Sequence, residues 1–339
     1  MKKIALSKIN ELYNEINGIC NLFLPVKKAG SLDFAKYENG VEVDINTLQT
    51  VKSAKDFFFP QSEDMMSFKT DGKNIEIKDA RQVVDTFVIF GVRACDVKSF
   101  EVLDKVFLAE PVDTMYKQKR ENGIIFTLSC NNPHSSCFCK NFGIDAANPM
   151  GDVDCHIVAD YLYLDAKTEK GSDILNKLTL LEDADSKVVE ENKAEIVEKI
   201  NALPFSNLDL SVFKGENLMP LFNRSEWDEL SKACLGCGTC TFVCPTCQCF
   251  DIRDFKTNSG VVRFRCWDSC MYSEFTKMAA ENPRTTQLQR FRQRFMHKLV
   301  YYPSKNDGLY SCVGCGRCVK KCPQMLNIVK VIKKLGGNN

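Results

Sequence analysis

The chain has 339 residues, with 45 basic and 44 acidic side chains and 18 cysteines. This length allows about two domains, and the near balance of charge gives no field that would attract nucleic acid or an anionic membrane surface. No stretch approaches the roughly 18 apolar residues of a membrane span, and the N-terminal segment lacks the apolar run of a signal peptide. We therefore expect a soluble cytoplasmic protein whose cysteines are reduced ligands, with no nucleic-acid or membrane partner.

The first part of the chain has the pattern of a mixed α/β domain, over residues 1–215. Helical spacing of apolar residues predicts a helix within 1–20, and Ser62, followed by two acidic residues, is typical of a helix start. Residues 85–91 predict a buried strand and 95–107 a helix, and further strands are expected at 124–128 and 155–164. Residues 165–203 are charged and helical in pattern.

The second part, residues 216–339, is expected to be a mainly helical ferredoxin-type domain with an insertion at 247–300. The predicted fold class is thus α+β. The boundary near residue 215 rests on the change to a cysteine-rich, helical pattern from about Asn217 onward.

Two identical cysteine ladders dominate this second part. Each reads C-x2-C-x2-C-x3-C-P, and the second lies 78 positions after the first. This is the ligand pattern of bacterial ferredoxins, in which the fourth cysteine binds the other cluster. The pattern therefore predicts two [4Fe-4S] clusters: the first cluster on Cys234, Cys237, Cys240 and Cys322, the second on Cys312, Cys315, Cys318 and Cys244.

Structural zinc and disulfides are the alternatives for such cysteines. Zinc ribbons separate two C-x2-C pairs by about 15 to 20 residues, whereas each ladder here packs four cysteines into eleven positions. The repeated spacing with its prolines favours iron-sulfur clusters.

A third group of cysteines lies at two predicted strand ends. Parallel strands would bring these ends together, and the four thiols would then hold a further cluster. The alternative is that they are buried apolar side chains. The group is Cys95, Cys130, Cys137 and Cys139, with Cys155 as a reserve ligand and His134 as a weaker one.

Four more cysteines lie in the insertion, and Cys20 has the pattern of a core residue. We expect the four to line a neighbouring cluster and tune its potential, although a fourth metal site stays open. They are Cys247, Cys249, Cys266 and Cys270.

A basic stretch precedes the second ladder. Its charge would favour the reduced form of a cluster or dock an acidic partner, and an ordinary solvated helix face is the alternative. The stretch contains Arg284, Arg290, Arg292, Arg294, His297 and Lys298.

The chain has neither a G-x-G-x-x-G dinucleotide motif nor a P-loop, and it has three histidines in all. We therefore assign no catalytic residues and no flavin or nicotinamide site. An electron carrier of this kind needs partners at both ends.

Several segments resemble one known family, in the order FVIFGVRACDVKSFEVLDKVF, CNNPHSSCFCKNFG, CLGCGTCTFVCPTCQCFD, RCWDSC, NPR, RFRQRFMHK and CVGCGRCVKKCP, over about residues 50–325. The family contains the iron-sulfur electron-transfer subunit of anaerobic sulfite reductase and the beta subunit of cytosolic NiFe sulfhydrogenase. The resemblance implies a non-catalytic subunit that relays electrons from an NAD(P)H-oxidising flavin subunit. The acceptor would be a siroheme subunit that reduces sulfite to sulfide or, alternatively, a NiFe catalytic subunit.

Two other functions stay open from the sequence. A self-contained enzyme would use a cluster with an open iron position near Cys247, Cys249 and Cys270. An iron-sulfur redox sensor would need a nucleic-acid or effector surface, which the balanced charge argues against.

Overall fold

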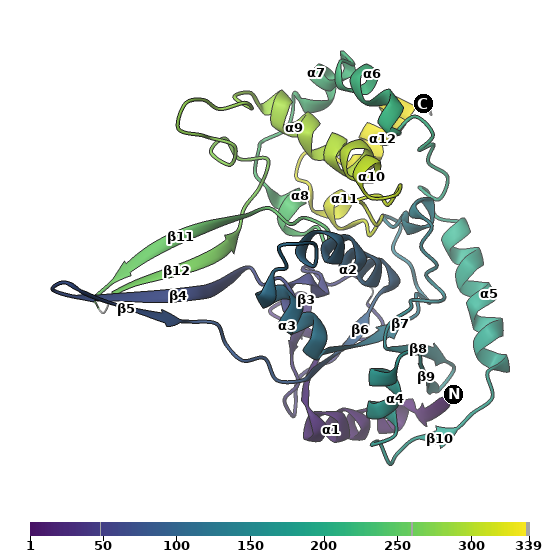
Figure 1. Cartoon of the computed structure of the whole chain (residues 1–339). Helices are drawn as coiled ribbons and strands as arrows, with labels where there is room; N and C mark the ends of the chain where they lie inside the picture. The colour runs from purple at the N-terminus through teal and green to yellow at the C-terminus, as the bar shows by residue number, and fades with distance from the viewer. Residues whose placement is uncertain (48, 259, 337–339) are drawn as a thin grey trace.

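The computed structural model describes residues 1–47, 49–258 and 260–336 (Figure 1). The N-terminal part is built on an eight-stranded mixed sheet in the order β10-β1-β9-β8-β7-β6-β2-β3. The four strands β2, β6, β7 and β8 are parallel to their neighbours in this run, and the outer pairings are antiparallel. The strands are β1 Lys2–Ala5, β2 Asn21–Lys28, β3 Ser31–Lys36, β6 Phe87–Val92, β7 Gly123–Leu128, β8 Val153–Val158, β9 Tyr161–Ala166 and β10 Glu182–Asp183.

The central strands β6 and β7 are buried along their whole length, as their continuous apolar sequence predicts. Their side chains alternate between two cores. Val88 and Phe90 face a core that includes α1 (Ile9–Ile19), whereas Phe87 and Ile89 face a second core with α2 (Ala94–Phe107) and α3 (Thr114–Asn122). The predicted strand at 85–91 and helix at 95–107 are confirmed.

Three predicted elements differ from the observed ones. The helix expected within 1–20 begins only at Ile9, because Lys2–Ala5 pairs with β9 as β1. Ser62 begins a strand and not a helix, because the residues that follow pair with two neighbouring strands. The charged segment 165–203 contains two separate helices, α4 (Glu169–Leu175) and α5 (Lys187–Asn201).

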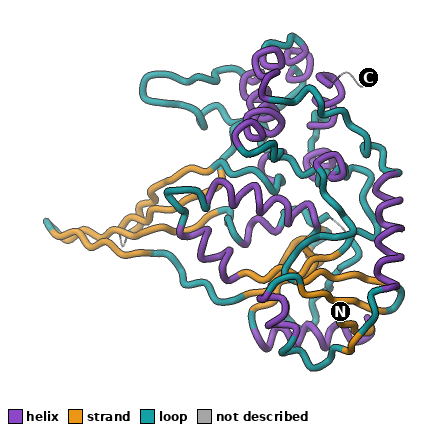
Figure 2. The backbone as a smooth tube through the Cα atoms, turned by 45° about the vertical axis from the view of Figure 1, so that its right-hand side comes forward, coloured by secondary structure: helices purple, strands orange, loops and turns teal. Residues whose placement is uncertain are grey.

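A second sheet projects from the body as an arm, in the order β11-β12-β4-β5 (Figures 1 and 2). It joins two hairpins from distant parts of the chain, β4 Ser62–Asp71 with β5 Asn74–Asp79, and β11 Phe250–Thr257 with β12 Gly260–Trp267. At its base Trp267 Nε1 donates a hydrogen bond to the carbonyl oxygen of Phe59 over 3.0 Å. The expectation of a mainly helical C-terminal domain is therefore not confirmed, because the insertion supplies two strands of this sheet.

The remainder of the C-terminal part consists of short helices around a core that contains Trp227, Phe291 and Phe295. It contacts the N-terminal part directly, since Tyr302 Oη donates to the carbonyl oxygen of Val102 over 2.8 Å. The helices are α6 Leu218–Phe222, α7 Glu226–Ser231, α8 Thr239–Phe242, α9 Gln287–Met296, α10 Tyr302–Lys305, α11 Arg317–Lys321 and α12 Ile328–Gly336, with a π-helical turn at His297–Tyr301. Across the described ranges, no helix is long and apolar enough to span a membrane.

Candidate metal centre

The cysteines assigned to the first cluster line one cavity. It is bordered by Cys234, Cys237 and Cys240 from the first ladder and by Cys322 from the end of the second. Apolar side chains of the C-terminal core, among them Met271, Phe291 and Phe295, form the rest of the wall. The structure thus places Cys322, from the end of the second ladder, beside the first ladder, as the predicted exchange of ligands requires. The ligand assignment itself stays a prediction.

The cysteines assigned to the second cluster lie more deeply. Cys244 and Cys315 are each 9% exposed. Burial raises the pKa of Cys312 to about 12, and repulsion from the thiolates of Cys244 and Cys315 adds to this rise. Burial likewise raises the pKa of Cys318, with the same neighbours contributing. These four thiols are therefore mutual neighbours that lose their protons readily only when a cation or metal compensates the charge.

The third group of cysteines also converges on one cavity. Because β6 and β7 are parallel neighbours, the ends of both strands lie together, and Cys95 and Cys130 follow these ends. Cys137 and Cys139 join them from the loop after Cys130, and all four line the cavity. Burial raises the pKa of Cys137 to about 12.

The reserve ligands of this group lie elsewhere. Cys155 is fully buried on β8 in the main core, and the lining described for the cavity does not include it. His134 is bound locally, since its Nδ1 lies 2.9 Å from Ser136 Oγ. Cys20 packs against the main core, as its apolar surroundings in the sequence predict.

Backbone contact joins the third group to the second ladder. Gly314 and Gly316 have positive φ angles of 59° and 74°, and a Cβ on them would lie 2.5 Å from Phe138 C and directly against Ser136 Oγ. Phe138 N also donates to the carbonyl oxygen of Gly314 over 2.8 Å. Only glycine fits such an approach, so the second ladder and the third group are held side by side.

Gln49 bridges the same two loops. Its Nε2 donates to the carbonyl oxygen of Cys315 over 2.6 Å and lies 3.6 Å from Cys137 Sγ. Cys315 itself lines the cavity of the third group. The second and third sets of thiols therefore share a wall.

The four cysteines of the insertion divide into two kinds. Cys247 is within hydrogen-bonding reach of Cys244, and Cys249 is within reach of Cys270, beside the two ladders. Cys266 instead lies on β12, near Arg253 of the arm. Across the described ranges, no three His, Cys, Asp or Glu side chains gather around the position of a single metal ion. That these cysteines line a neighbouring cluster stays a prediction.

A buried arginine contacts the first ladder. Arg294 is 2% exposed, and its Nε donates to Cys240 Sγ over 3.0 Å. Its Nη2 donates to the carbonyl oxygen of Cys240 over 2.7 Å, whereas Nη1 is buried without a protein partner. Burial would lower its pKa, but the thiolate charges of Cys240, Cys247, Cys318 and Cys244 together outweigh this effect, and the pKa is raised.

Two buried lysines lie close by. Lys298, 4% exposed, donates to Thr246 Oγ1 and the carbonyl oxygen of Ser311 over 2.8 and 2.9 Å. Lys55, 2% exposed, donates to the carbonyl oxygen of Cys247 over 2.9 Å and lies 3.6 Å from the centre of the Trp267 ring. Burial lowers the pKa of Lys55 to about 8.

The charges of Arg294, Lys298 and Lys55 show whether an iron-sulfur cluster would fit this region. Among the described residues, none of the three forms an ion pair with a carboxylate. A buried charge without a counter-ion is costly. A cluster held by four thiolates is negatively charged and accepts hydrogen bonds at sulfur, so it would balance these cations and give Arg294 Nη1 an acceptor. The residues present fit iron-sulfur clusters.

The residues of the basic stretch thus lie in different surroundings. Arg294 and Lys298 point into the cysteine region, whereas Arg292 stacks on the Phe222 ring at 3.5 Å. Burial lowers the pKa of His297 to about 4, which keeps it neutral. Sequence reasoning missed Lys55, because it precedes Cys247 by 192 positions and no local pattern marks it.

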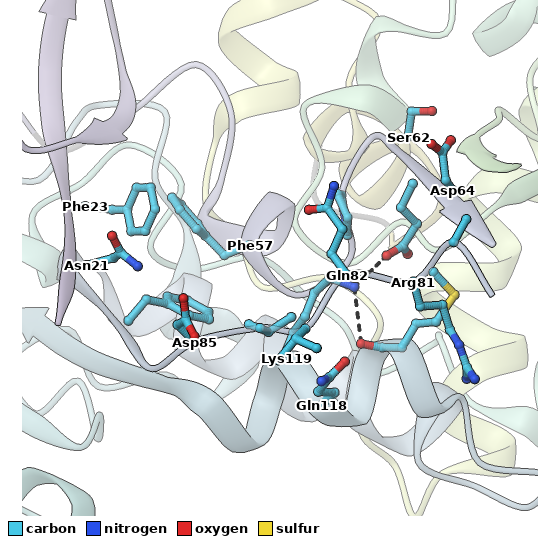
Figure 3. A pocket seen from close by; sticks show the side chains of 17 residues that line it. Asn21, Phe23, Phe57, Ser62, Asp64, Arg81, Gln82, Asp85, Gln118 and Lys119 are labelled. Carbon is cyan, nitrogen blue, oxygen red and sulfur yellow. Dashed lines mark hydrogen bonds and ion pairs between the residues drawn. The ribbon is translucent and has the colours of Figure 1, made fainter. Parts of the chain in front are cut away.

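A larger cavity of about 560 Å³ lies at the base of the arm, away from the cysteines (Figure 3). Its wall includes the rings of Phe23 and Phe57 and the polar side chains of Arg81 and Gln118. Lys119 Nζ on this wall pairs with Glu63 Oε2 at 2.5 Å. We assign no chemistry to this cavity, because the ion pair on its wall joins α3 to β4 and so has a structural role.

Comparison with known proteins agrees with this geometry. Residues 233–326 match the model of a 4Fe-4S dicluster domain. The chain is 31% identical to sulfhydrogenase 2 subunit beta of Pyrococcus furiosus over 336 aligned residues. The alignment covers 96% of this chain and 95% of the relative. This chain belongs to the sulfhydrogenase beta-subunit family. No solved structure shows significant similarity to it.

Membership of the sulfhydrogenase beta-subunit family, with the dicluster match, supports an iron-sulfur electron-transfer subunit of an oxidoreductase complex carrying at least two 4Fe-4S clusters. The relative's name agrees with the alternative that the sequence left open, a sulfhydrogenase subunit. The preferred prediction of a sulfite reductase subunit is not confirmed by these matches.

Proposed function

We propose that this chain is a three-cluster electron relay in a sulfhydrogenase-type complex. The third group of cysteines would hold a further [4Fe-4S] cluster, next to the second cluster, which in turn exchanges its fourth ligand with the first. Electrons would then pass along a line from the end of the parallel sheet to the first ladder. The observation that supports this best is the cavity lined by Cys95, Cys130, Cys137 and Cys139, which Cys315 also borders.

The individual ligand assignments are part of the proposal. The first cluster is assigned to Cys234, Cys237, Cys240 and Cys322, and the second to Cys312, Cys315, Cys318 and Cys244. When bound, the clusters supply one-electron redox chemistry. The protein contributes the thiolates, the buried cations that balance their charge, and an apolar wall that limits access of water.

The catalytic partner is proposed from the relative's name, and the flavin partner from the family that the sequence segments resemble. One end of the relay would contact a catalytic subunit of the hydrogenase type, and the other end would contact an NAD(P)H-oxidising flavin subunit. A siroheme subunit that reduces sulfite is the second candidate, because the ladder, CPTC and WDSC segments resemble both kinds of complex.

Iron counting tests the relay. The anaerobically purified full chain should contain about twelve iron atoms for three cubes, against about eight for two. Replacing Cys95 or Cys130 by Ser should remove about four iron atoms and one set of EPR signals, whereas Cys155→Ser should leave the iron content unchanged. Wild-type protein with about eight iron atoms would exclude the third cluster, and protein without a reducible cluster would exclude the relay.

The complex itself tests the partners. A complex purified through a tag on this chain should contain nickel and a flavin. Siroheme in place of nickel would overturn the hydrogenase assignment and favour sulfite reduction.

A further inference from the structure

The two ladder loops have nearly the same sequence but different surroundings. Leu235 follows the first cysteine of the first ladder and is 64% exposed, whereas Val313, 78 positions later in the equivalent place, is 2% exposed. The next cysteines differ in the same way, because Cys237 is exposed and Cys315 is buried. Equivalent loops therefore have opposite relations to solvent.

The two loops differ in exposure because different parts of the chain pack on them. The second loop is covered by backbone, since a Cβ on Gly314 or Gly316 would meet atoms of Phe138 or Ser136. At the equivalent glycines of the first loop, Gly236 and Gly238, such a Cβ would first meet the side-chain ends of Gln287 and Tyr272. The first loop thus lies at the surface of the molecule.

Two exposed apolar side chains lie on the segments that line the first cluster's cavity. Leu235 lines that cavity and is 64% exposed. Met325 is 68% exposed and lies between Gln324 and Leu326, which both line the same cavity. Single exposed apolar residues are ordinary on proteins. These two, however, stand on the loops that carry Cys234, Cys237 and Cys322.

We propose that this exposed face of the first ladder is the docking surface for the redox partner of this chain, a protein subunit that brings its own electron-transfer centre against Leu235 and Met325. The surface joins the segments 234–238 and 322–326. The inference rests on the proposed function, because it requires a cluster on Cys234, Cys237, Cys240 and Cys322.

The chemistry of the site selects this occupant. Four cysteine ligands leave no open iron position for a small substrate, so only electrons cross this surface, and they need an acceptor or donor in contact with it. Leu235 and Met325 provide an apolar contact. The exposed lysines beside the two segments, Lys232, Lys320 and Lys321, give its edge a positive charge. A partner subunit with an apolar contact face and acidic side chains around it fits both features.

The test uses the complex purified anaerobically through a tag on this chain. Leu235→Asp and Met325→Asp should each slow electron exchange with the partner subunit, or weaken its retention, at least about tenfold, the equivalent of about 1.4 kcal/mol. Met150→Asp is the matched control, because Met150 is also 68% exposed and also has a positive φ, 61° against 53° for Met325. Backbone amides of residues 234–240 should exchange more slowly with deuterium in the complex than in the isolated chain.

Iron content and EPR spectra are recorded for every variant. Wild-type exchange rates in both aspartate variants, with the first cluster intact, would overturn the docking surface alone. A dimer of the isolated chain that Leu235→Asp converts to a monomer would assign the surface to a second copy and also overturn it. Absence of the first cluster from wild-type protein would overturn the proposed function first.

Discussion

Arg294 donates a hydrogen bond from Nε to Cys240 Sγ over 3.0 Å, and a second one from Nη2 to the carbonyl oxygen of the same residue over 2.7 Å. The guanidinium is buried and contacts at two atoms a residue that we propose as a ligand of the first cluster. A cation at a ligand sulfur stabilises the more negative, reduced cluster. The reduction potential of the first cluster therefore depends on a residue of α9.

We expect Arg294→Gln to lower this potential on the order of 60 mV, which is a tenfold change for one electron. Arg294→Lys should retain much of the wild-type value, because the charge remains while the second donor is lost. Arg292→Gln is the control, since Arg292 stacks on Phe222 instead. EPR-monitored redox titration measures all four proteins, and equal potentials in the wild type and Arg294→Gln would contradict the effect.

Because the second ladder and the third group are in close contact, we expect that adding one methyl group between them will reduce the iron content of the protein. Gly316→Ala would place a Cβ against Ser136 atoms, in a backbone conformation with φ of 74°. Gly143 has a similar φ of 68° but open space around it, so Gly143→Ala should cost only the conformational strain of about 1 kcal/mol. We expect Gly316→Ala to lose iron from the second and third sets, and iron analysis with EPR to find full occupancy in Gly143→Ala. A full iron content in both variants would show that the second ladder and the loop of the third group can move apart without loss of a cluster.

Local features of the sequence predicted the parts of the centre that depend on short spacing. The cysteines of each ladder lie within a few residues of one another, so the sequence alone predicted that Cys322 would lie beside the first ladder, as the structure shows. The buried strands β6 and β7 were also predictable, because continuous apolar runs are typical of parallel central strands. Their parallel order then placed Cys95 beside Cys130.

Contacts between distant segments could not be predicted in this way. Lys55 reaches Cys247 across 192 positions, and β12 pairs with β4 from the other half of the chain. Ser62 has a local helix-start pattern, but pairing of the following residues with β12 and β5 decides their conformation. Strand preference depends on such neighbours more than on intrinsic propensity.

A buried ion pair fastens the second ladder to the sheet domain. Arg317 of α11 pairs with Asp96 of α2 at 2.6 and 2.8 Å, and both side chains are at most 3% exposed. Asp96→Asn removes the carboxylate partner of a buried arginine, which should lower the free energy of unfolding by about 3 to 5 kcal/mol. Glu101→Gln breaks the exposed pair with Lys98 and should cost no more than about 0.5 kcal/mol. Anaerobic denaturant unfolding compares the two, and equal midpoints would contradict the role of the pair.

Buried His156 predicts how stability depends on pH. Burial lowers its pKa to about 4 from an ordinary 6.5, and Nδ1 has no protein partner. The imidazole of His156 takes up a proton at a higher pH in the unfolded chain than in the folded one. The stability that the folded protein gains from keeping His156 neutral is therefore fully present above about pH 6.5 and is lost as the pH falls toward about 4. Between about pH 7.5 and about pH 5, the free energy of unfolding should fall by about 2 kcal/mol more in the wild type than in His156→Gln. Anaerobic unfolding at both pH values measures this difference, and parallel pH profiles for the two proteins would show that His156 titrates normally in the folded state.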